Sequence, residues 1–538
     1  FSMESLAQNM NLDFTGNPDA KKTYISYESR SLTRSVNRNQ EAPPMRIISH
    51  AHSTSDGGNR YKRAALVLDS ISNENLRWPR SVDIATTRDS TMDSNVSVSN
   101  QIIVESEVLS YVKNKDLNAE MYANVLNHGL DVIKADLSKI KPPSAPSKGR
   151  NNQKLATTAD LISLLLSCAQ AVSASNARRA QEILKEIRQD SSPYGSDVQR
   201  LAHYFAEGLV ARLSGTGGQL FTALSSNRPS AAKMLKAHHL FVEICPFVKV
   251  SHYFANRAIV KAAKGASRLH IVDYGILYGL QWPGLISALA EREGGPPSLR
   301  ITGIELPQPQ NSSERLEMTG RCLAEYARTY GVPFEFCPIA TDWQNVDVRT
   351  LQKRPDEILV VNSIFRLRHL FDETVLASNP REVVLKNIFD MRPKIFIQGI
   401  CNGNYNTPFF MSRFKEALTL FASKFDMLET TISSDNQERM MIEREIMGKA
   451  ILNIIACEGQ ERVERPETYR QWQNRVQKAG FVQIALDQSL MRDVPTIVKR
   501  KYNKNFSIDQ HGCWMLLGWK GKVFHGLSLW KPGNHSIN

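Results

Sequence analysis

The spacing of apolar residues changes along the chain and divides it into regions with different expected structures. Beyond the first 150 residues, apolar positions recur at helical spacing in three stretches, 161–172, 180–187 and 198–213. Pro193 and Gly195 interrupt the pattern between the last two stretches. This pattern predicts a bundle of helices, each of which has one wide apolar face.

After Gly265, short apolar runs alternate with amphipathic stretches. The runs predict buried strands at 269–273, 299–305, 334–338, 358–361, 395–398 and 427–431. The amphipathic stretches predict helices at 281–292, 314–330, 381–391 and 408–424. Such alternation is typical of an α/β fold, in which helices cover both faces of a parallel sheet.

The end of the chain carries a different pattern. Residues 513–519 and 522–530 are two apolar runs around Lys520 and Gly521, and they predict two antiparallel strands joined by a tight turn. A parallel sheet that ends in an antiparallel hairpin is a mixed sheet, and many methyltransferase-like folds have this arrangement. The predicted fold is therefore α/β, with a methyltransferase-like (Rossmann-type) core, a mixed sheet and an added helical layer.

The N-terminal region has too few apolar residues to form a core. Residues 1–100 are rich in Ser, Asn, Asp and Thr, so we expect 1–150 to be largely disordered. Inside it, apolar residues on one helical face predict only a transient helix at 102–140. The Pro- and Ser-rich segment 142–150 indicates a linker before the folded part.

The net charge of +13 is concentrated in the folded part of the chain. Residues 1–150 hold 19 basic and 17 acidic residues, whereas the remainder holds 48 and 37. A basic surplus permits binding to nucleic acid, acidic proteins or anionic surfaces, and selects none of them. No run of about 18 apolar residues occurs, so we expect no membrane span.

Several classes of chemistry lack their signatures. The seven cysteines are widely and irregularly spaced, which argues against a zinc ribbon and favours a reducing compartment. The chain also has no phosphate-binding loop, zinc-protease or serine-hydrolase motif. We therefore expect no metal site.

The strongest candidate for cofactor binding is the strand 269–273 with the turn that follows it. Asp273 ends the strand and Gly275 and Gly279 follow, which is similar to the first motif of S-adenosylmethionine-dependent methyltransferases. Glu305, at the end of the next predicted strand, has the usual place of a ribose-binding acid. An S-adenosylmethionine-dependent methyltransferase is therefore the alternative function.

Two features weaken this alternative. Leu277 stands where a Gly-x-Gly-x-Gly turn needs its next glycine, and we expect its side chain to fill space that a cofactor needs. The gap from Asp273 to Glu305 is 32 residues, which is longer than the roughly 20 residues of dinucleotide sites. We expect no cofactor and assign no catalytic residue.

Three other features have structural interpretations. His270 lies in an apolar strand and is expected to be a satisfied core histidine. Residues 462–465 precede Pro466, a plausible helix start, and their alternating charge predicts a solvated face or a surface ion-pair network. The LxxLL pattern at 161–165 has its leucines on the apolar face, which favours core packing.

Several motifs in fixed order make residues 159–532 resemble the GRAS family. The helical stretches on either side of 269–273 resemble its two leucine-rich regions, and 275–283 resembles the Scarecrow-like branch. The motif residues are Leu269, His270, Ile271, Val272 and Asp273 in VHIID; Arg444 and Glu445 in PFYRE; Arg462, Val463, Glu464 and Arg465 in RVER; and Trp514, Trp519 and Trp530 in SAW.

The resemblance implies a plant transcriptional regulator that acts in the nucleus without enzymatic activity. It further implies pairing with DNA-binding transcription factors or other GRAS proteins, homodimers included, and DNA contact that is direct or made through partners. The motif residues are then structural. The implied division is a variable region at 1–150, a helical cap with the first leucine-rich region at 151–265, and an α/β core with the remaining motifs at 266–538.

Overall fold

The computed structural model describes residues 158–533, except 227, 228, 230, 308–311, 352 and 434. The predicted disorder of 1–150 and the transient helix at 102–140 lie outside the described residues. All elements below belong to one unit of the chain.

A mixed sheet forms the centre of the described part, and it has nine strands there in the order β3-β2-β1-β4-β5-β9-β8-β7, with β6 beside β9. The parallel strands are β1 (Arg268–Tyr274), β2 (Ser298–Glu305), β3 (Phe334–Ala340), β4 (Glu357–Ile364) and β5 (Ile395–Cys401). The antiparallel strands are β6 (Phe481–Ile484), β7 (Phe506–His511), β8 (Trp514–Trp519) and β9 (Lys522–Pro532). The predicted α/β fold with a methyltransferase-like core and a C-terminal antiparallel hairpin is confirmed.

The order of the strands fixes where a ligand would bind in such a fold. The chain adds β2 and β3 on one side of β1, then returns to add β4 and β5 on the other. In open α/β sheets, ligands bind at the carboxyl ends of the strands where the order reverses. The crevice to inspect therefore lies beyond the carboxyl ends of β1 and β4.

Helices cover both faces of the sheet, which explains why every residue of β1 after Arg268 is buried. One face packs against α10 (Phe247–Ala262), α11 (Trp282–Ala290), α12 (Ser312–Thr329) and α18 (Gln488–Lys501). The other face packs against α13 (Pro380–Asp390), α17 (Tyr469–Lys478) and the short turns η1 (Trp343–Asn345), η2 (Val348–Leu351) and η3 (Leu367–His369).

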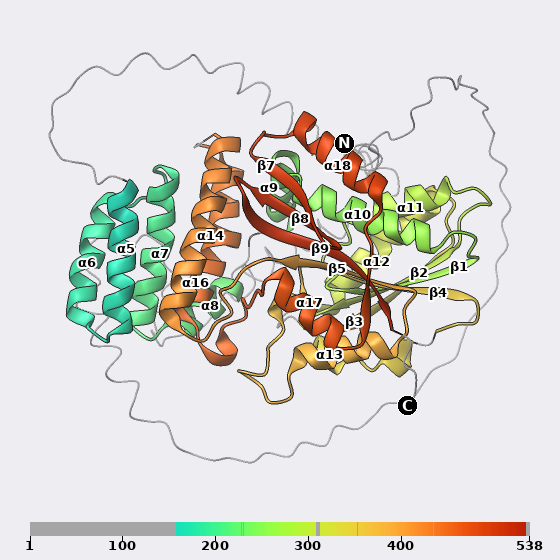
Figure 1. The fold of residues 1–538 in the computed structure, drawn as a ribbon, viewed down its shortest axis with the longest axis horizontal. Coiled ribbons are helices and arrows are strands. Elements are labelled where there is room, and N and C mark those ends of the chain that lie inside the picture. Colours follow the sequence, from blue (N-terminus) through green and yellow to red (C-terminus); the bar gives the residue numbers. More distant parts are fainter. Residues whose placement is uncertain are drawn as a thin grey trace, which may run out of the picture. The chain divides into compact units, whose positions relative to one another are not determined.

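A separate helical layer joins two distant stretches of the chain (Figure 1). Its first stretch supplies α5 (Thr158–Ser173), α6 (Ala177–Asp190), α7 (Asp197–Leu213), α8 (Gly217–Ser226) and α9 (Ala231–Ile244). Its second supplies α14 (Phe410–Thr431), α15 (Gln437–Met441), the π-helix η4 (Ile442–Gly448) and α16 (Lys449–Ala456), and the short turn η5 (Gly459–Glu461) follows. Because α14 and α16 pack against α7, the layer draws on both sides of residue 265.

Local sequence signals account for the start of α7. The Ser196 hydroxyl accepts from the Gln199 amide while the Gln199 side chain accepts from the Ser196 amide, which satisfies two of the unpaired donors at a helix start. In α5, Leu161 and Leu165 are buried, so the prediction that the LxxLL leucines serve core packing is confirmed.

One predicted strand is helical in the structure, and strands β6 and β7 were not predicted. The strand expected at 427–431 is wrong, because these residues form the last turns of α14, where Met427 and Leu428 remain on the buried face. A short apolar run does not distinguish a strand from a buried helical turn. Strand β7 was not predicted, since its second half is polar and exposed.

Candidate functional site

The turn after β1 has the backbone of a cofactor-binding loop. Gly275 and Gly279 have φ of 97° and 66°, values that favour glycine because other residues are strained there. Leu277 also lies in the left-handed region, at φ 53°. Leucine therefore occupies a conformation that suits glycine, as six other non-glycine residues of the described part also do.

Asp273, at the carboxyl end of β1, is enclosed by its own neighbours. Its two carboxylate oxygens accept hydrogen bonds from Trp282 Nε1 at 3.1 Å and from Asn362 Nδ2 at 2.9 Å. Burial raises the pKa of Asp273 to about 7, although these two hydrogen bonds act in the opposite direction. Both oxygens have protein partners, so this acid is a closed structural group.

Glu305, the acid expected to hold a ribose, is also fully engaged. Its oxygens accept from the amides of Leu277 and Leu306, each at 3.1 Å. Arg366 Nη2 lies 3.1 Å from one oxygen, and Arg315 Nη2 lies 3.6 Å from the other. Only 1% of the surface of Glu305 is exposed. Its carboxylate therefore pairs with arginines of the same chain, in the position where it would otherwise bind the ribose of a nucleoside.

Arg366 fills the space above the glycine turn. A Cβ placed on Gly275 would lie 2.5 Å from Arg366 Cγ, so the arginine stem lies directly against this glycine. The guanidinium continues over the ring of Trp343, with Cζ 5.7 Å from the ring centroid. Because Gly275 has no side chain, its backbone can be approached closely, and the group that approaches it is the Arg366 side chain of the same protein.

The role predicted for Leu277 stays a prediction. Its side chain is 36% exposed, and the side chain that lies against Gly275 is that of Arg366. The reason is local: the Leu277 amide donates to Glu305, and its carbonyl accepts from Thr319 Oγ1 at 3.2 Å. These bonds fix the backbone of the turn and leave the leucine at the surface.

His270 is a core histidine, as predicted, but only one of its ring nitrogens has a hydrogen-bond partner. Its Nε2 lies 2.8 Å from Thr302 Oγ1, and its Nδ1 lies 3.7 Å from Glu357 Oε2, which pairs with Arg300. Burial lowers the pKa of His270 to about 4, so the ring is neutral at physiological pH. It lies away from the glycine turn, in the first half of β1.

The prediction that 462–465 form a solvated face is wrong. Arg462 and Arg465 are 2% and 1% exposed, and the segment is extended, with α17 starting only at Tyr469. Arg462 donates to the carbonyls of Tyr405 and Asn406, and Arg465 donates to those of Arg462 and Gly459. Most partners of these cations are carbonyls, although Arg462 Nε is buried without one, and sequence charge patterns do not reveal such partners.

The other two residues of this segment are likewise held in place. The amides of Val463 and Glu464 both donate to Asn453 Oδ1 at 2.9 Å. The Glu464 carboxylate pairs with Arg368 at 3.0 Å. These contacts connect α16, through Asn453, with the loop after β4, through Arg368.

Arg444 and Glu445 lie on the π-helix η4. The two form an ion pair at 2.8 Å, and Glu445 also pairs with Lys449 at 2.7 Å. Beneath them, the fully buried Glu443 pairs with Arg200 and Arg439 at 3.1 and 3.4 Å. The buried charge cluster thereby connects the π-helix with α7. Arg444 itself stays exposed.

The three terminal tryptophans are buried on both faces of the sheet. Trp514 and Trp530 lie in the cluster with α13 and α17, and Trp519 lies in the cluster on the opposite face. Each indole N–H has a partner: Gln473 Oε1, Ser528 Oγ and Asp426 Oδ2 respectively. The hairpin is thus inserted into the core, and Asp426 links it to α14.

Within the part of the chain that the structure describes, no group of His, Cys, Asp or Glu residues could hold a metal ion. No helix there is long and apolar enough to cross a membrane.

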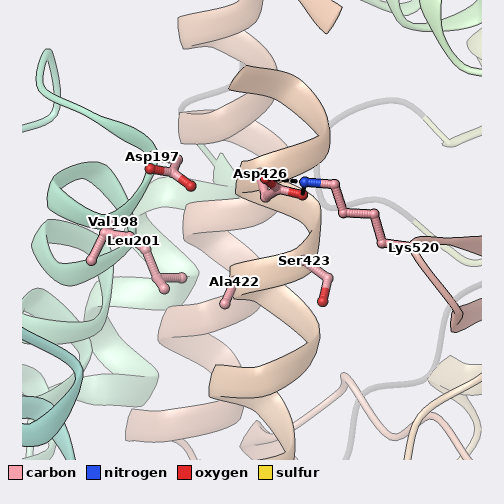
Figure 2. A pocket seen from close by; sticks show the side chains of 7 residues that line it. All are labelled: Asp197, Val198, Leu201, Ala422, Ser423, Asp426 and Lys520. Carbon is pink, nitrogen blue, oxygen red and sulfur yellow. Dashed lines mark hydrogen bonds and ion pairs between the residues drawn. The ribbon is translucent and has the colours of Figure 1, made fainter. Parts of the chain in front are cut away.

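A shallow hollow of about 280 Å³ lies between α7, α14 and the β8–β9 turn, where Lys520 pairs with Asp426 (Figure 2).

Sequence reasoning found the turn and both acids, and it missed the residues that close the site. Trp282, Asn362 and Arg366 come from three different elements, and no local pattern marks any of them as a partner of Asp273 or Glu305. The only available signal was the bulky Gln281-Trp282-Pro283 sequence at the start of α11.

Together, the fold and this site define a methyltransferase-like α/β domain with a helical layer, in which the chain's own side chains occupy the cofactor turn. The protein belongs to the GRAS family, whose domain profile matches residues 161–531. The motif order set out above agrees with this assignment.

Relatives and a solved structure agree with the family. The chain is 48% identical to Scarecrow-like protein 14 of Arabidopsis thaliana over 399 residues, which cover 74% of this chain and 52% of that protein. It is 36% identical to chitin-inducible gibberellin-responsive protein 2 of Oryza sativa subsp. japonica, covering 69% of this chain and 68% of that one. The crystal structure of SCL7 from Oryza sativa matches with a TM-score of 0.60 at 29% identity, covering 69% of this chain and 99% of that chain.

The chain spans about half the length of several curated Scarecrow-like relatives, 52% of both Scarecrow-like protein 14 and Scarecrow-like protein 9 of Arabidopsis thaliana. The similarity therefore describes the GRAS domain, and activities of the whole relatives are not carried over with it.

Proposed function

We propose that this protein is a nuclear regulator of transcription that works as a protein interaction platform and catalyses no reaction. The observation that carries the proposal is the closed cofactor turn, in which Arg366 lies against Gly275 and pairs with Glu305. Fold alone would favour an enzyme, so the occupied site decides between the two functions. The methyltransferase alternative has no open site among the described residues to support it.

Membership of the GRAS family supports the regulatory part of the proposal. Its plant relatives carry the names Scarecrow-like and gibberellin-responsive. The partners we propose are DNA-binding transcription factors and other GRAS proteins, and contact with DNA is direct or made through them. A second copy of the chain is included among these partners.

The motif residues have a structural role in this proposal. The buried tryptophans, the arginines at 462 and 465 and the enclosed Asp273 all hold distant elements together. We also propose the division into a variable region at 1–150, a helical region at 151–265 and an α/β region at 266–538, and the last of these also contributes α14 and α16 to the helical layer. The helical layer then offers the exposed surface on which partners assemble.

A tethering experiment tests this function. The full chain is fused to a heterologous DNA-binding domain and expressed in plant cell nuclei beside a reporter that carries the matching sites. We expect reporter transcription to change relative to the DNA-binding domain alone, in either direction. The same fusion carrying Trp530→Ala, which removes a buried core residue, serves as the destabilised control. An unchanged reporter with a stably expressed fusion contradicts the proposal.

A further inference from the structure

The hollow between the helical layer and the hairpin has an apolar floor. Val198 and Leu201 of α7 and Ala422 of α14 line it (Figure 2). Its volume of about 280 Å³ is just below the roughly 300 Å³ at which small-molecule sites begin. The hollow therefore suits one large apolar side chain better than a free ligand.

The carboxylates at the edge of the hollow are Asp197 and Asp426. Asp426 is already engaged, because Trp519 Nε1 lies 2.7 Å from one oxygen and Lys520 Nζ is 2.9 Å away. Asp197 is in the first turn of α7, where a negative charge is stabilised by the helix dipole. Both charges are thus accounted for within the fold, and neither requires a cationic ligand.

Beside the hollow lies a basic surface, which we define by Lys520 and five cations near it. Lys520 connects the two features, because it lines the hollow while its amide donates to the Asn505 carbonyl at 2.9 Å. The start of β7 pairs with the end of β8, and Tyr502 lies against Phe506. These contacts bring the end of α18 and the hairpin turn to the same end of the sheet. The basic surface comprises Lys499, Arg500, Lys501, Lys504, Lys520 and Lys522.

The basic surface carries more positive charge than its carboxylate partners neutralise. Of its six cations, only Lys520 has a carboxylate partner among the described residues. The three at the end of α18 complement the helix dipole, which gives them a local structural role. Lys504 and Lys522 lie outside that helix, so the dipole does not explain them.

We propose that the hollow and the basic surface together bind an acidic peptide segment of a partner protein, which inserts one bulky apolar side chain into the hollow. Acidic residues on either side of that side chain would face the basic surface, and such charge complementarity steers association and fixes register. This inference rests on the proposed interaction platform and names the chemistry of one partner.

A nucleic acid fits this surface less well. A phosphate backbone gains nothing from the apolar floor formed by Val198, Leu201 and Ala422. An acidic-apolar peptide uses both features, because its apolar residue enters between the helices and its acids remain outside.

Fluorescence anisotropy with the full chain tests the proposal. The probe is a labelled synthetic peptide in which Asp and Glu surround a single Trp. Two matched peptides replace the Trp by Ser or replace the acids by Asn and Gln, and duplex DNA of unrelated sequence is the competing polyanion. We expect saturable binding of the first peptide alone, weakened by salt because exposed charges are screened over about 10 Å at 0.1 M.

Variants of the chain locate the binding surface. Lys504→Glu combined with Lys522→Glu should weaken peptide binding by about tenfold or more, which corresponds to about 1.4 kcal/mol. Ala422→Trp should weaken it by filling the hollow. The matched control combines Lys353→Glu with Lys531→Glu, which makes the same charge change at exposed sites elsewhere and should stay within about twofold. Melting curves confirm that each variant is folded.

Three results would overturn the inference. They are equal weakening by the control pair, equal binding of the Ser-substituted peptide, or binding of DNA in place of the peptide with the same dependence on Lys504 and Lys522. Absence of peptide binding by a chain that still alters the tethered reporter also overturns it, and leaves the proposed function standing. Loss of the reporter response with peptide binding intact would contradict the proposed function and leave this inference standing.

Discussion

Two regions of this protein, the turn after β1 and the hollow beside the hairpin, differ in how their polar groups are satisfied. At the turn, Asp273 and Glu305 are buried and every oxygen has a partner from the same chain. At the hollow, apolar side chains line an open surface beside cations such as Lys504 and Lys522 that have no carboxylate partner among the described residues. The first region is closed in the place where the fold would bind a cofactor, and the second is open in a place that the fold does not specify.

At the turn, the chain keeps the backbone geometry of a methyltransferase-like architecture while its own side chains contact that backbone. The glycines of the turn keep their positive φ values, and the acid after β2 keeps its position. Arg366 contacts Gly275 and pairs with Glu305. The close backbone approach that glycine permits is thus used to pack a side chain of the same chain.

The largest expected effect comes from the interior that both regions share. Trp530→Ala removes a fully buried side chain and its hydrogen bond to Ser528, which should reduce the free energy of unfolding by about 3–5 kcal/mol. Chemical denaturation measures this change. Val482→Ala, on the neighbouring strand and half exposed, should change it by less than about 0.5 kcal/mol. A Trp530→Ala protein that unfolds like the wild type but binds no partner would assign this residue to the surface instead.

A smaller effect is expected when the closed region is opened. Arg366→Ala leaves Glu305 buried with Arg315 and two amides as partners, so the free energy of unfolding should fall by about 1–3 kcal/mol. Arg366→Met keeps most of the stem against Gly275 and separates lost packing from lost charge. If neither variant changes the denaturation midpoint, Arg366 does not close the site as described.

The pH dependence of stability should report the burial of Asp273. Its pKa in the folded chain is about 7, above the unfolded value of about 4, so the folded chain binds more protons between these values. The contribution of Asp273 to stability therefore falls as pH rises through this window, by at most about 1.4 kcal/mol per pH unit.

Asp273→Asn removes this titration. We expect the unfolding free energy of the variant, minus that of the wild type, to increase steadily from pH 5 to pH 7 and then level off. Urea denaturation at several pH values measures the difference. A difference that does not vary with pH would mean that Asp273 is ionised in the folded chain throughout.

The smallest effect is expected at Leu277. Glycine suits its φ of 53°, whereas the loss of a partly exposed side chain and the greater freedom of the unfolded chain oppose that gain. Leu277→Gly should therefore change the free energy of unfolding by no more than about 0.5 kcal/mol. It should also fail to create a cofactor site, because Arg366 remains in place. Cofactor binding by this variant would restore the role that the sequence predicted for Leu277.

The parts of the fold that sequence predicts are those with an unambiguous local pattern. Strands such as 269–273 and 299–305 are apolar runs bounded by turn residues, and both occur in the structure. The segment 427–431 is apolar only at Met427 and Leu428, and it continues a helix because helical spacing across α14 places Phe425 and Leu428 on the same buried face. The hairpin was predicted because its two runs flank a Lys-Gly turn.

The candidate site was predicted only to the extent that its parts are local. The glycine turn and the two acids follow directly from the sequence, whereas their partners come from elements that only the folded chain brings together. The burial of Arg462 has the same origin, because it donates to the carbonyls of Tyr405 and Asn406, which are 57 and 56 residues away in the chain. Side-chain patterns carry no information about such carbonyl partners.

Isothermal titration of the wild-type chain with S-adenosylmethionine, at high protein concentration, tests the central claim that the cofactor turn is closed. The account predicts no saturable heat, since Arg366 occupies the turn and Glu305 has no free oxygen. Saturable binding with a Kd tighter than about 100 µM, equivalent to about −5.5 kcal/mol, would contradict it and reopen the methyltransferase alternative.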